Sequence, residues 1–248
     1  IARQKRRFKG DAVRVATQQI DLLVTPDHPM LCWDQHEQPI VFPAADAKTR
    51  PHGRHPLRYW RTAKWEGTEA KTYSPIPGLI VLMDDWLYFL GWFLSEGHTS
   101  KTKVKQWCAY SVSLAQKKNL EMIDRVARLW LGWGLKFSVC NRADGVCVIK
   151  GASPFYAPLS AFGKSDNKYA PDYVKDLSPR QIKIFLDALF DGDGTMVNGA
   201  CAVYTTTSKR LADDVQELLL RVGSVGTVGV RHTTPAHKKP VYYVCVSH

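Results

Sequence analysis

Two long apolar helices dominate the pattern of hydrophobic and polar positions along the chain. The first is predicted to run from about Asp84 to Glu96 and the second over 182–193, where the segment 178–181 (SPRQ) has a capping-box arrangement with proline at the first helical position. Each helix has small residues four positions apart, which lie on one face and let two helices touch backbone to backbone. Each also ends in an acid followed by glycine, a residue typical of a left-handed helix stop.

The elements that follow each apolar helix repeat in the same order. After the first helix, the pattern predicts a strand over 107–114, an amphipathic helix over 117–131, a hairpin over 135–150 and a short helix over 154–162. After the second, it predicts a strand over 201–206, a helix over 209–222 and strands near 225–230 and 241–246. The two copies align as αββαββα, which predicts an α+β fold with pseudo-two-fold symmetry. The second copy stops at His248 without its last helix, and we interpret the carboxyl end as cut off.

The region before the first apolar helix has a different character. It is rich in turn-forming residues, and short apolar alternations at 12–15 and 20–24 indicate strands. We therefore predict three parts: a β-rich, basic N-terminal extension over 1–75, a first repeat over 76–175 and a second repeat over 176–248.

The charge of the chain points to a polyanionic partner. Lysine and arginine number 34 against 23 acids, which gives a formal net charge of +11 and a pI near 9.4. Six cysteines without a dense spacing indicate reduced thiols, not a disulfide framework. The most apolar stretch, 75–94, is interrupted by Asp84 and Asp85, which argues against a membrane span. No signal peptide is visible, so we expect a cytoplasmic, organelle-matrix or nucleoid-associated protein that is not secreted.

The acids at the ends of the two apolar helices carry the candidate chemistry. A carboxylate at a helix C-terminus faces the negative end of the helix dipole, at a cost of about 0.3–1 kcal/mol. If the helix ends meet, Glu96 and Asp193 also repel each other unless one of them takes a proton. A divalent cation removes both penalties, and paired carboxylates suit Mg²⁺.

The two nonapeptides that end in these acids resemble the paired LAGLIDADG, or dodecapeptide, motifs of homing endonucleases. They are FLGWFLSEG at 89–97 and LDALFDGDG at 186–194, and the resemblance covers about residues 76–248. It implies a monomer with internal pseudo-two-fold symmetry that hydrolyses both strands of double-stranded DNA. Cleavage would be Mg²⁺-dependent and would occur across the minor groove of a long asymmetric target.

The resemblance also implies roles for individual residues. Glu96 and Asp193 would share two or more Mg²⁺ ions, with the backbone carbonyls of Gly97 and Gly194 joining them. Glu96 stands where the family usually has aspartate, but it keeps a carboxylate. Asp191 lies about 200° round the helix from Asp193 and is not expected to be a ligand.

A lysine-containing stretch before the second motif gives a further candidate. The segment 164–171 (KSDNKYAP) resembles the stretch that precedes the second motif in intein-type members, whose lysine points into the active site. By position this residue is Lys168, with Lys164 as second choice and a solvated linker lysine as the alternative. Gln116 and Ser208 stand at matched strand ends and are candidates to hydrogen-bond waters near the metals.

Basic residues on the predicted strands and on the extension are candidates for DNA contacts. For the basic segment of the extension, a solvated loop is the alternative. The residues assigned to DNA binding are Lys101, Lys103, Lys105, Lys136, Arg142, Lys150, Arg231, Lys238, Lys239, Arg54, Arg58 and Arg61.

Two other functions stay open at this point. RNA maturases and some transcription regulators share the fold without cutting DNA. The segment 24–28 (VTPDH) resembles the Thr-x-x-His motif of intein splicing domains, so Thr25 and His28 are candidates for a splicing relic, and the endonuclease would then be part of an intein. Splicing itself needs a Cys or Ser nucleophile and a terminal Asn, whereas this chain begins with Ile1 and ends with His248.

Overall fold

The computed structural model describes residues 8–16, 20–34, 36, 38–48, 64–104, 107–197, 201–232 and 239–247. The chain forms two compact units, Ile1–Thr62 and Ala63–His248. The first unit therefore ends before the boundary predicted at residue 75. The reason is that residues after 63 pack on the second unit: the indole Nε1 of Trp65 donates to the carbonyl of Leu177 at 2.8 Å.

The first unit is built from two antiparallel hairpins around a small core. β1 (Val13–Ala16) pairs with β2 (Asp21–Val24), and β3 (Pro29–Trp33) pairs with β4 (Pro39–Pro43), which leads into the 3₁₀ helix η1 (Ala44–Lys48). Its buried residues include Met30, Cys32 and Phe42. The strands predicted at 12–15 and 20–24 are confirmed, each within one residue.

The second unit contains the two predicted repeats. A hairpin of β5 (Thr72–Ile76) and β6 (Leu79–Leu82) precedes them. The first repeat consists of α1 (Met83–Glu96), β7 (Gly97–Val104), β8 (Trp107–Gln116), α2 (Leu120–Gly132), β9 (Phe137–Asn141), β10 (Cys147–Gly151), η2 (Ser153–Phe155) and α3 (Tyr156–Ser160). The short helix α4 (Asp172–Lys175) lies in the linker. The second repeat consists of α5 (Pro179–Asp193), β11 (Gly194–Val197), β12 (Cys201–Thr206), α6 (Lys209–Arg221), β13 (Val225–Arg231) and β14 (Val241–Ser247).

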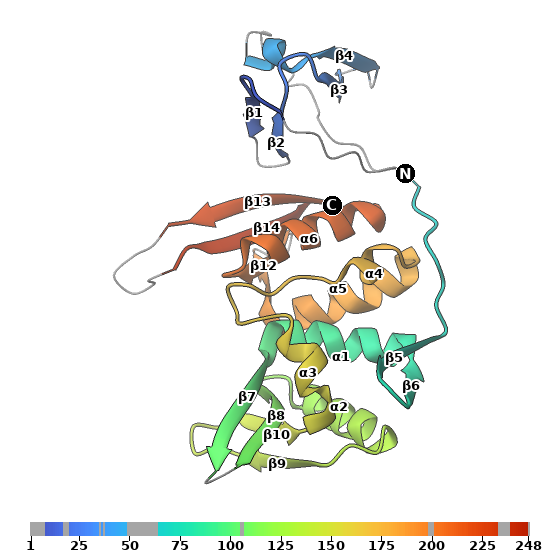
Figure 1. Cartoon of the computed structure of the whole chain (residues 1–248), viewed down its shortest axis with the longest axis vertical. Coiled ribbons are helices and arrows are strands. Elements are labelled where there is room, and N and C mark those ends of the chain that lie inside the picture. The colour runs from blue at the N-terminus through green and yellow to red at the C-terminus, as the bar shows by residue number, and fades with distance from the viewer. Residues whose placement is uncertain are drawn as a thin grey trace. The chain divides into compact units, whose positions relative to one another are not determined.

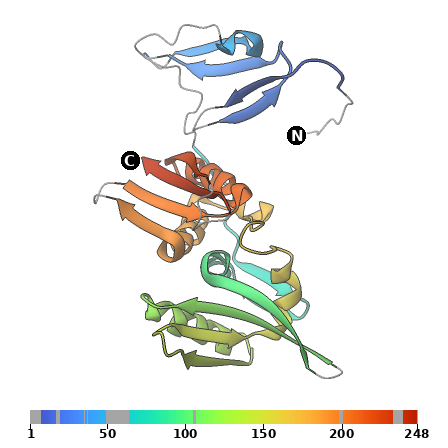
Figure 2. The same cartoon turned by 90° about the vertical axis from the view of Figure 1, so that its left-hand side faces the viewer.

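Each repeat forms one four-stranded antiparallel sheet with the same strand order. The orders are β7-β8-β10-β9 and β11-β12-β14-β13, so the predicted α+β fold with pseudo-two-fold symmetry is confirmed. Figures 1 and 2 show the two sheets on opposite sides of the central helices α1 and α5. The sequence pattern did not predict β7 and β11, the edge strands that directly follow the acids. β7 is almost entirely polar, and its pairing with β8, from Gly97↔Leu114 to Val104↔Trp107, defines it as a strand.

The helices α1 and α5 pack through their smallest residues. A Cβ atom placed on Gly91 would lie 2.7 Å from the Cβ of Ala188, and one placed on Gly192 would lie 2.7 Å from the Cβ of Ser95. Such distances are too short for real side chains, so the helices cross at these pairs. This confirms the predicted backbone-to-backbone packing, and it brings the carboxyl ends of both helices together.

The helix starts differ in detail from the prediction. α1 begins at Met83 without a side-chain cap, and Asp84 instead accepts hydrogen bonds from the side chains of Arg180 and Gln181. Ser178 does cap α5, because its Oγ accepts from the N–H of Gln181 at 3.3 Å. The side chain of Gln181 does not complete a capping box with Ser178. It accepts from the N–H of Ala70 at 2.9 Å and donates to the Ala70 carbonyl at 2.6 Å.

These contacts of Gln181 predict a stability effect. Replacing Gln181 with leucine would leave the backbone N–H and C=O of Ala70 without their partner, so we expect the free energy of unfolding to fall by about 2–3 kcal/mol. Urea denaturation measures the change. Lys183→Ala, on the same helix, removes only an exposed ion pair with Asp187 and should cost under about 0.5 kcal/mol. Equal costs for the two variants would contradict the assignment of residues 64–82 to this unit.

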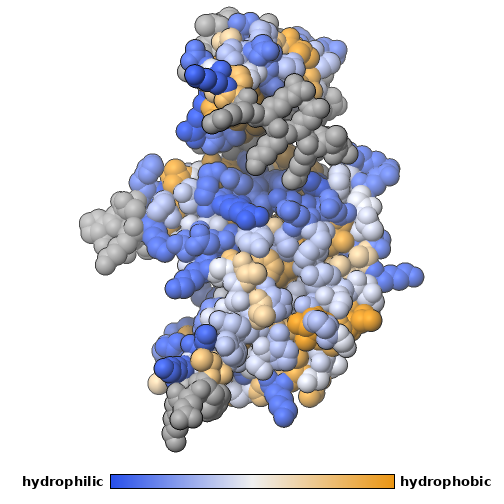
Figure 3. Space-filling view, viewed as in Figure 1, coloured by the Kyte–Doolittle hydropathy of each residue, from blue (hydrophilic) through white to orange (hydrophobic). Residues whose placement is uncertain are grey.

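The second repeat is covered by the amphipathic helix α6. Its apolar face, including Leu211, Val215 and Leu218, is fully buried in a core that both repeats share. Its polar face carries Lys209, Asp213 and Glu217, and Figure 3 shows that hydrophilic side chains predominate over the region of α4 and α6.

Candidate active site

The two acids stand at the adjoining ends of α1 and α5. Glu96 is the last residue of α1 and Asp193 the last of α5. A Cβ atom on Gly192, the neighbour of Asp193, would lie only 3.5 Å from the Cγ of Glu96. Two positions so far apart in the sequence therefore lie side by side, as the paired motifs predicted.

Burial makes both carboxyl groups hard to ionise, and repulsion by Asp193 adds to this effect for Glu96. Burial raises the pKa of Glu96, and the charge of Asp193 raises it further. Burial also raises the pKa of Asp193, while the ammonium of Lys168 opposes this shift. The site therefore favours a proton or a cation that neutralises the pair.

The glycines that follow the acids do not form left-handed helix stops. Gly97 and Gly194 have φ values of −93° and −89°, and each begins the next strand. Glycine is required here for space instead, because a Cβ on Gly97 would lie 2.6 Å from the carbonyl oxygen of Phe93. The prediction of a left-handed conformation was wrong for this reason.

Lys168 lies beneath the end of α1. It is only 5% exposed, and its Nζ donates to the carbonyls of Phe93 and Leu94, each at 3.0 Å, and of Gly97 at 2.7 Å. Burial lowers the pKa of Lys168 to about 8, and the carboxylates of Asp193 and Glu96 oppose that shift. The structure thus places the first-choice lysine beside both acids. The Gly97 carbonyl faces an ammonium, which does not favour it as a metal ligand.

Gln116 and Ser208 contact the site in different ways. The Nε2 of Gln116 donates to the Oε1 of Glu96 at 3.2 Å, and its own oxygen accepts from the N–H groups of Lys117 and Lys118. The Oγ of Ser208 donates to the carbonyl of Lys168 at 2.6 Å and caps α6. Ser208 therefore points at Lys168, not at a water position beside the acids.

Two residues near the acids were missed from the sequence. A cavity of about 560 Å³ lies beside Glu96 and is lined by Ser95, Glu96, Gly97, His98, Thr99, Tyr156, Ser160, Gly163, Lys164, Ser165 and Lys168. Burial and the nearby Lys168 and Lys150 lower the pKa of His98. In the other repeat, the buried Tyr204 pairs with Gly194, as Leu114 pairs with Gly97. His98 was missed because β7 was not predicted, and the pairing of Tyr204 with Gly194 was missed because β11 was not predicted.

The lysines assigned to the first sheet lie on two different faces. In the sheet register, Lys150 lies across from Ser113 on β8 and Ser138 on β9. Its side chain is on the opposite face of the sheet from that of the buried Ile149. Lys101 pairs with Tyr110, and Lys103 with Cys108, on the face of Val112 and Leu114. Because side chains alternate along a strand, Lys101 and Lys103 do not share a surface with Lys150. The sheet register thus separates these two lysines from Lys150, and the assignment of each to DNA binding stays a prediction.

The other basic residues are distributed around the two sheets. Lys136 and Arg142 are exposed next to β9, and Arg142 pairs with Asp144 at 3.2 Å. Arg231 ends β13 above the ring of Tyr243, and Lys239 pairs with Asp166 at 2.6 Å. Lys105, Lys238, Arg54, Arg58 and Arg61 lie outside the described residues.

Thr25 and His28 form the ends of a tight turn after β2. The N–H of His28 donates to the carbonyl of Thr25 at 3.1 Å, and the carbonyl of His28 accepts from Ala44 at 2.9 Å. The Thr25 hydroxyl lowers the pKa of Asp27. The structure thus brings the two residues together but does not test a role in splicing.

Two properties of the described residues bear on the site. Within them, no group of three or more His, Cys, Asp or Glu side chains could hold a metal ion. In the same ranges, no helix is long and apolar enough to cross a membrane.

Comparison with known proteins agrees with this geometry. A family profile described as a LAGLIDADG-like domain matches residues 180–248. A structure of the homing endonuclease I-DmoI in complex with DNA and Mn covers 66% of this chain and 90% of its own, with a TM-score of 0.52 and 19% identity. Another I-DmoI structure, with its target DNA in the presence of Mg, has a TM-score of 0.52 and 20% identity. The chain therefore has the LAGLIDADG endonuclease fold, and the resemblance to LAGLIDADG homing endonucleases is confirmed.

Curated relatives share only a segment with this chain. The ATP-dependent Clp protease proteolytic subunit of Chlamydomonas moewusii is 27% identical over 242 residues, and the match covers 89% of this chain and 24% of that protein. The C-terminal section of the beta subunit of DNA-directed RNA polymerase from Stigeoclonium helveticum is 24% identical over 269 residues, with 88% of this chain and 24% of that protein covered. The replicative DNA helicase DnaB of Synechocystis sp. is 27% identical over 164 residues, with 58% of this chain and 18% of that protein covered. The chain thus spans about a quarter or less of these relatives.

Proposed function

We propose that the chain is a site-specific endonuclease that cuts both strands of double-stranded DNA by hydrolysis. The observation that carries this proposal is the meeting of Glu96 and Asp193 at the ends of two crossed helices, with the Lys168 ammonium beneath them. Two carboxylates on a pseudo-two-fold axis suit a reaction on two antiparallel strands. The buried cation adds positive charge where a phosphate gains negative charge during hydrolysis.

The donor set fits Mg²⁺. Glu96 and Asp193 would hold the metal, because both offer oxygen ligands and both have a pKa raised by burial, which a cation offsets. When bound, Mg²⁺ activates water and stabilises the leaving 3′ oxygen. Gln116 would fix the carboxylate of Glu96 through the hydrogen bond at 3.2 Å.

The sheets would bind the DNA. The two repeats differ in sequence, so a monomer of this chain would recognise a long asymmetric target across the minor groove. The net charge of +11 favours a polyanion, and the I-DmoI structures of the same fold contain target DNA. We expect the protein in a compartment that holds DNA, such as the cytoplasm or an organelle matrix.

A cleavage assay tests the proposal. The substrate is the uninterrupted allele of the gene that encodes this chain, with Mg²⁺ or with EDTA. We expect a double-strand break with Mg²⁺ and none with EDTA. Tight binding without any cleavage, with Mg²⁺ or with Mn²⁺, would instead support a non-cleaving regulator or RNA maturase.

The curated relatives favour a second role, as the endonuclease part of a protein-splicing intein. A protease, an RNA polymerase and a helicase have unrelated functions, yet each shares a segment with this chain. An inserted module explains such a distribution, and the turn at Thr25 and His28 fits a splicing relic. Expression of the host polypeptide with this chain still inserted tests this role, because splicing yields a ligated host protein and a free insert.

The two faces of the first sheet predict different effects of lysine removal. Lys150→Ala should weaken DNA binding and reduce the magnitude of the salt slope, d log K/d log[salt], by about 1, because one phosphate contact is lost. Lys101→Ala should leave the slope unchanged, since Lys101 lies on the opposite face. Fluorescence anisotropy between about 50 and 200 mM salt measures both slopes. The reverse ranking would place the DNA on the other face.

A further inference from the structure

Two residues of the second repeat hold the backbone of the segment that joins the repeats. The Oγ of Ser208 donates to the carbonyl of Lys168 at 2.6 Å, and the Oδ2 of Asp214 accepts from the N–H of Ala170 at 2.9 Å. Both side chains belong to α6 or its cap, and both residues are buried. Backbone groups on either side of position 169 are therefore fixed to the second repeat.

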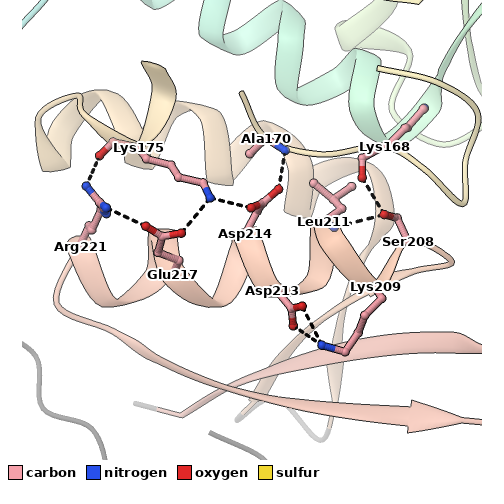
Figure 4. A network of polar contacts seen from close by, with 10 residues as sticks. All are labelled: Lys168, Ala170, Lys175, Ser208, Lys209, Leu211, Asp213, Asp214, Glu217 and Arg221. Atoms are coloured by element: carbon pink, nitrogen blue, oxygen red, sulfur yellow. Dashed lines mark hydrogen bonds and ion pairs between the residues drawn. The ribbon is translucent and has the colours of Figure 1, made fainter. Parts of the chain in front are cut away.

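The side chain of Lys168 donates hydrogen bonds to the first repeat. Figure 4 shows its backbone carbonyl facing Ser208 while the side chain points toward α1. Its Nζ reaches three carbonyls at the end of α1, with the shortest distance, 2.7 Å, to Gly97. A lysine has a long flexible side chain, so the placement of its ammonium depends on how firmly its backbone is held.

Further ion pairs hold the segment that joins the repeats against α6. Lys175, in the linker, pairs with Asp214 at 2.7 Å and with Glu217 at 2.8 Å. Glu217 also pairs with Arg221 at 2.7 Å. As Figure 4 shows, the linker is bound along the length of α6, from Ser208 to Arg221.

Gln116 has a related task in the first repeat. It is the last residue of β8, whereas Ser208 follows β12 and caps α6. Gln116 contacts Glu96 directly, whereas Ser208 reaches the end of α1 through Lys168. Gln116 and Ser208 therefore both contribute contacts to the helix end that carries Glu96, one directly and one through Lys168.

We propose that Ser208 is a positioning residue: by holding the Lys168 carbonyl, it sets where the ammonium lies against the end of α1. Through this contact the second repeat controls the surroundings of the acid of the first repeat. The effect on cleavage rests on the proposed endonuclease function, whereas the positioning of Lys168 does not.

The first test measures how well Lys168 is protected. The full chain is treated with N-hydroxysuccinimidyl acetate, without DNA or metal, and acetylation of Lys168 is followed by mass spectrometry. We expect roughly tenfold faster acetylation in Ser208→Ala and in Ser208→Asp, because both lack the hydroxyl donor, while Asp keeps the acceptor that caps α6. Ser208→Thr should restore protection. Asn119→Ala, which removes the equivalent cap of α2, should not change the rate at Lys168.

The second test measures single-turnover cleavage. Ser208→Ala should cut roughly tenfold more slowly with unchanged DNA affinity, whereas in a Lys168→Met background the same change should have no further effect. An equal slowing in both backgrounds, or unaltered acetylation of Lys168, would overturn the proposal. If the wild-type chain cuts no DNA but acetylation responds as expected, the positioning stands and the proposed function fails.

Discussion

Asp193→Asn and Glu96→Gln should each reduce cleavage by about a thousandfold or more while leaving DNA affinity nearly unchanged. An amide keeps the size of the carboxyl group but removes the negative charge that would hold Mg²⁺ between the helix ends. The acids lie at the ends of the helices, and the exposed basic residues that would bind phosphates are elsewhere on the sheets, so binding should persist. Single-turnover cleavage and anisotropy measure the two effects separately. Normal cutting by either variant would refute the assignment of the acids.

The same variants should also change the pH dependence of stability. Burial raises the pKa of both acids in the folded state, so the folded protein holds protons that the unfolded chain releases. Without metal, the wild type should therefore lose stability as pH rises from the ordinary carboxyl range through the raised values. Each amide variant lacks one of the two ionisable carboxyl groups, so it should lose less stability than the wild type over the same pH range.

Metal addition provides the matched control for this stability effect. At pH values above that range, Mg²⁺ should raise the denaturation midpoint of the wild type, because a ligand that binds only the folded state stabilises it. Asp193→Asn should show little or no rise. Equal Mg²⁺ responses in both proteins would place the metal elsewhere.

The helices could be predicted from the sequence because their apolar positions and small residues form an unbroken local pattern. The spacing of Gly91 and Ser95, matched by Ala188 and Gly192, was enough to predict the helix crossing and the meeting of the acids. The edge strand β7 could not be predicted in the same way. Its residues are mostly polar, and it is a strand because β8 supplies its hydrogen-bond partners.

Side-chain contacts between distant segments were the least predictable part of the site. Gln181 looked like half of a local capping box, but tertiary packing gives it Ala70 as partner. Ser208 was predicted to hydrogen-bond a water near the metals, and Lys168 to point into the active site. Each donates to a backbone carbonyl of a segment far away in sequence, a contact that no local pattern encodes.

Gly91→Val should disrupt both the stability and the activity of the protein. A Cβ at this position would lie 2.7 Å from both the Cβ of Ala188 and the carbonyl oxygen of Phe185. The backbone of α5 cannot move away as a flexible side chain can, so the helices must separate. We expect the free energy of unfolding to fall by about 3 kcal/mol, as measured by urea denaturation.

Gly132→Ala is the matched control for this substitution. Gly132 is the last residue of α2, and nothing lies within 4 Å of a Cβ added there. Alanine should raise stability by about 0.5 kcal/mol, because it restricts the unfolded chain without a clash. A Gly91→Val protein that still folds should cut DNA more slowly than Gly132→Ala, since separating the helices moves Glu96 away from Asp193. Full activity in Gly91→Val would mean that close contact of the helices is not what brings the two acids together.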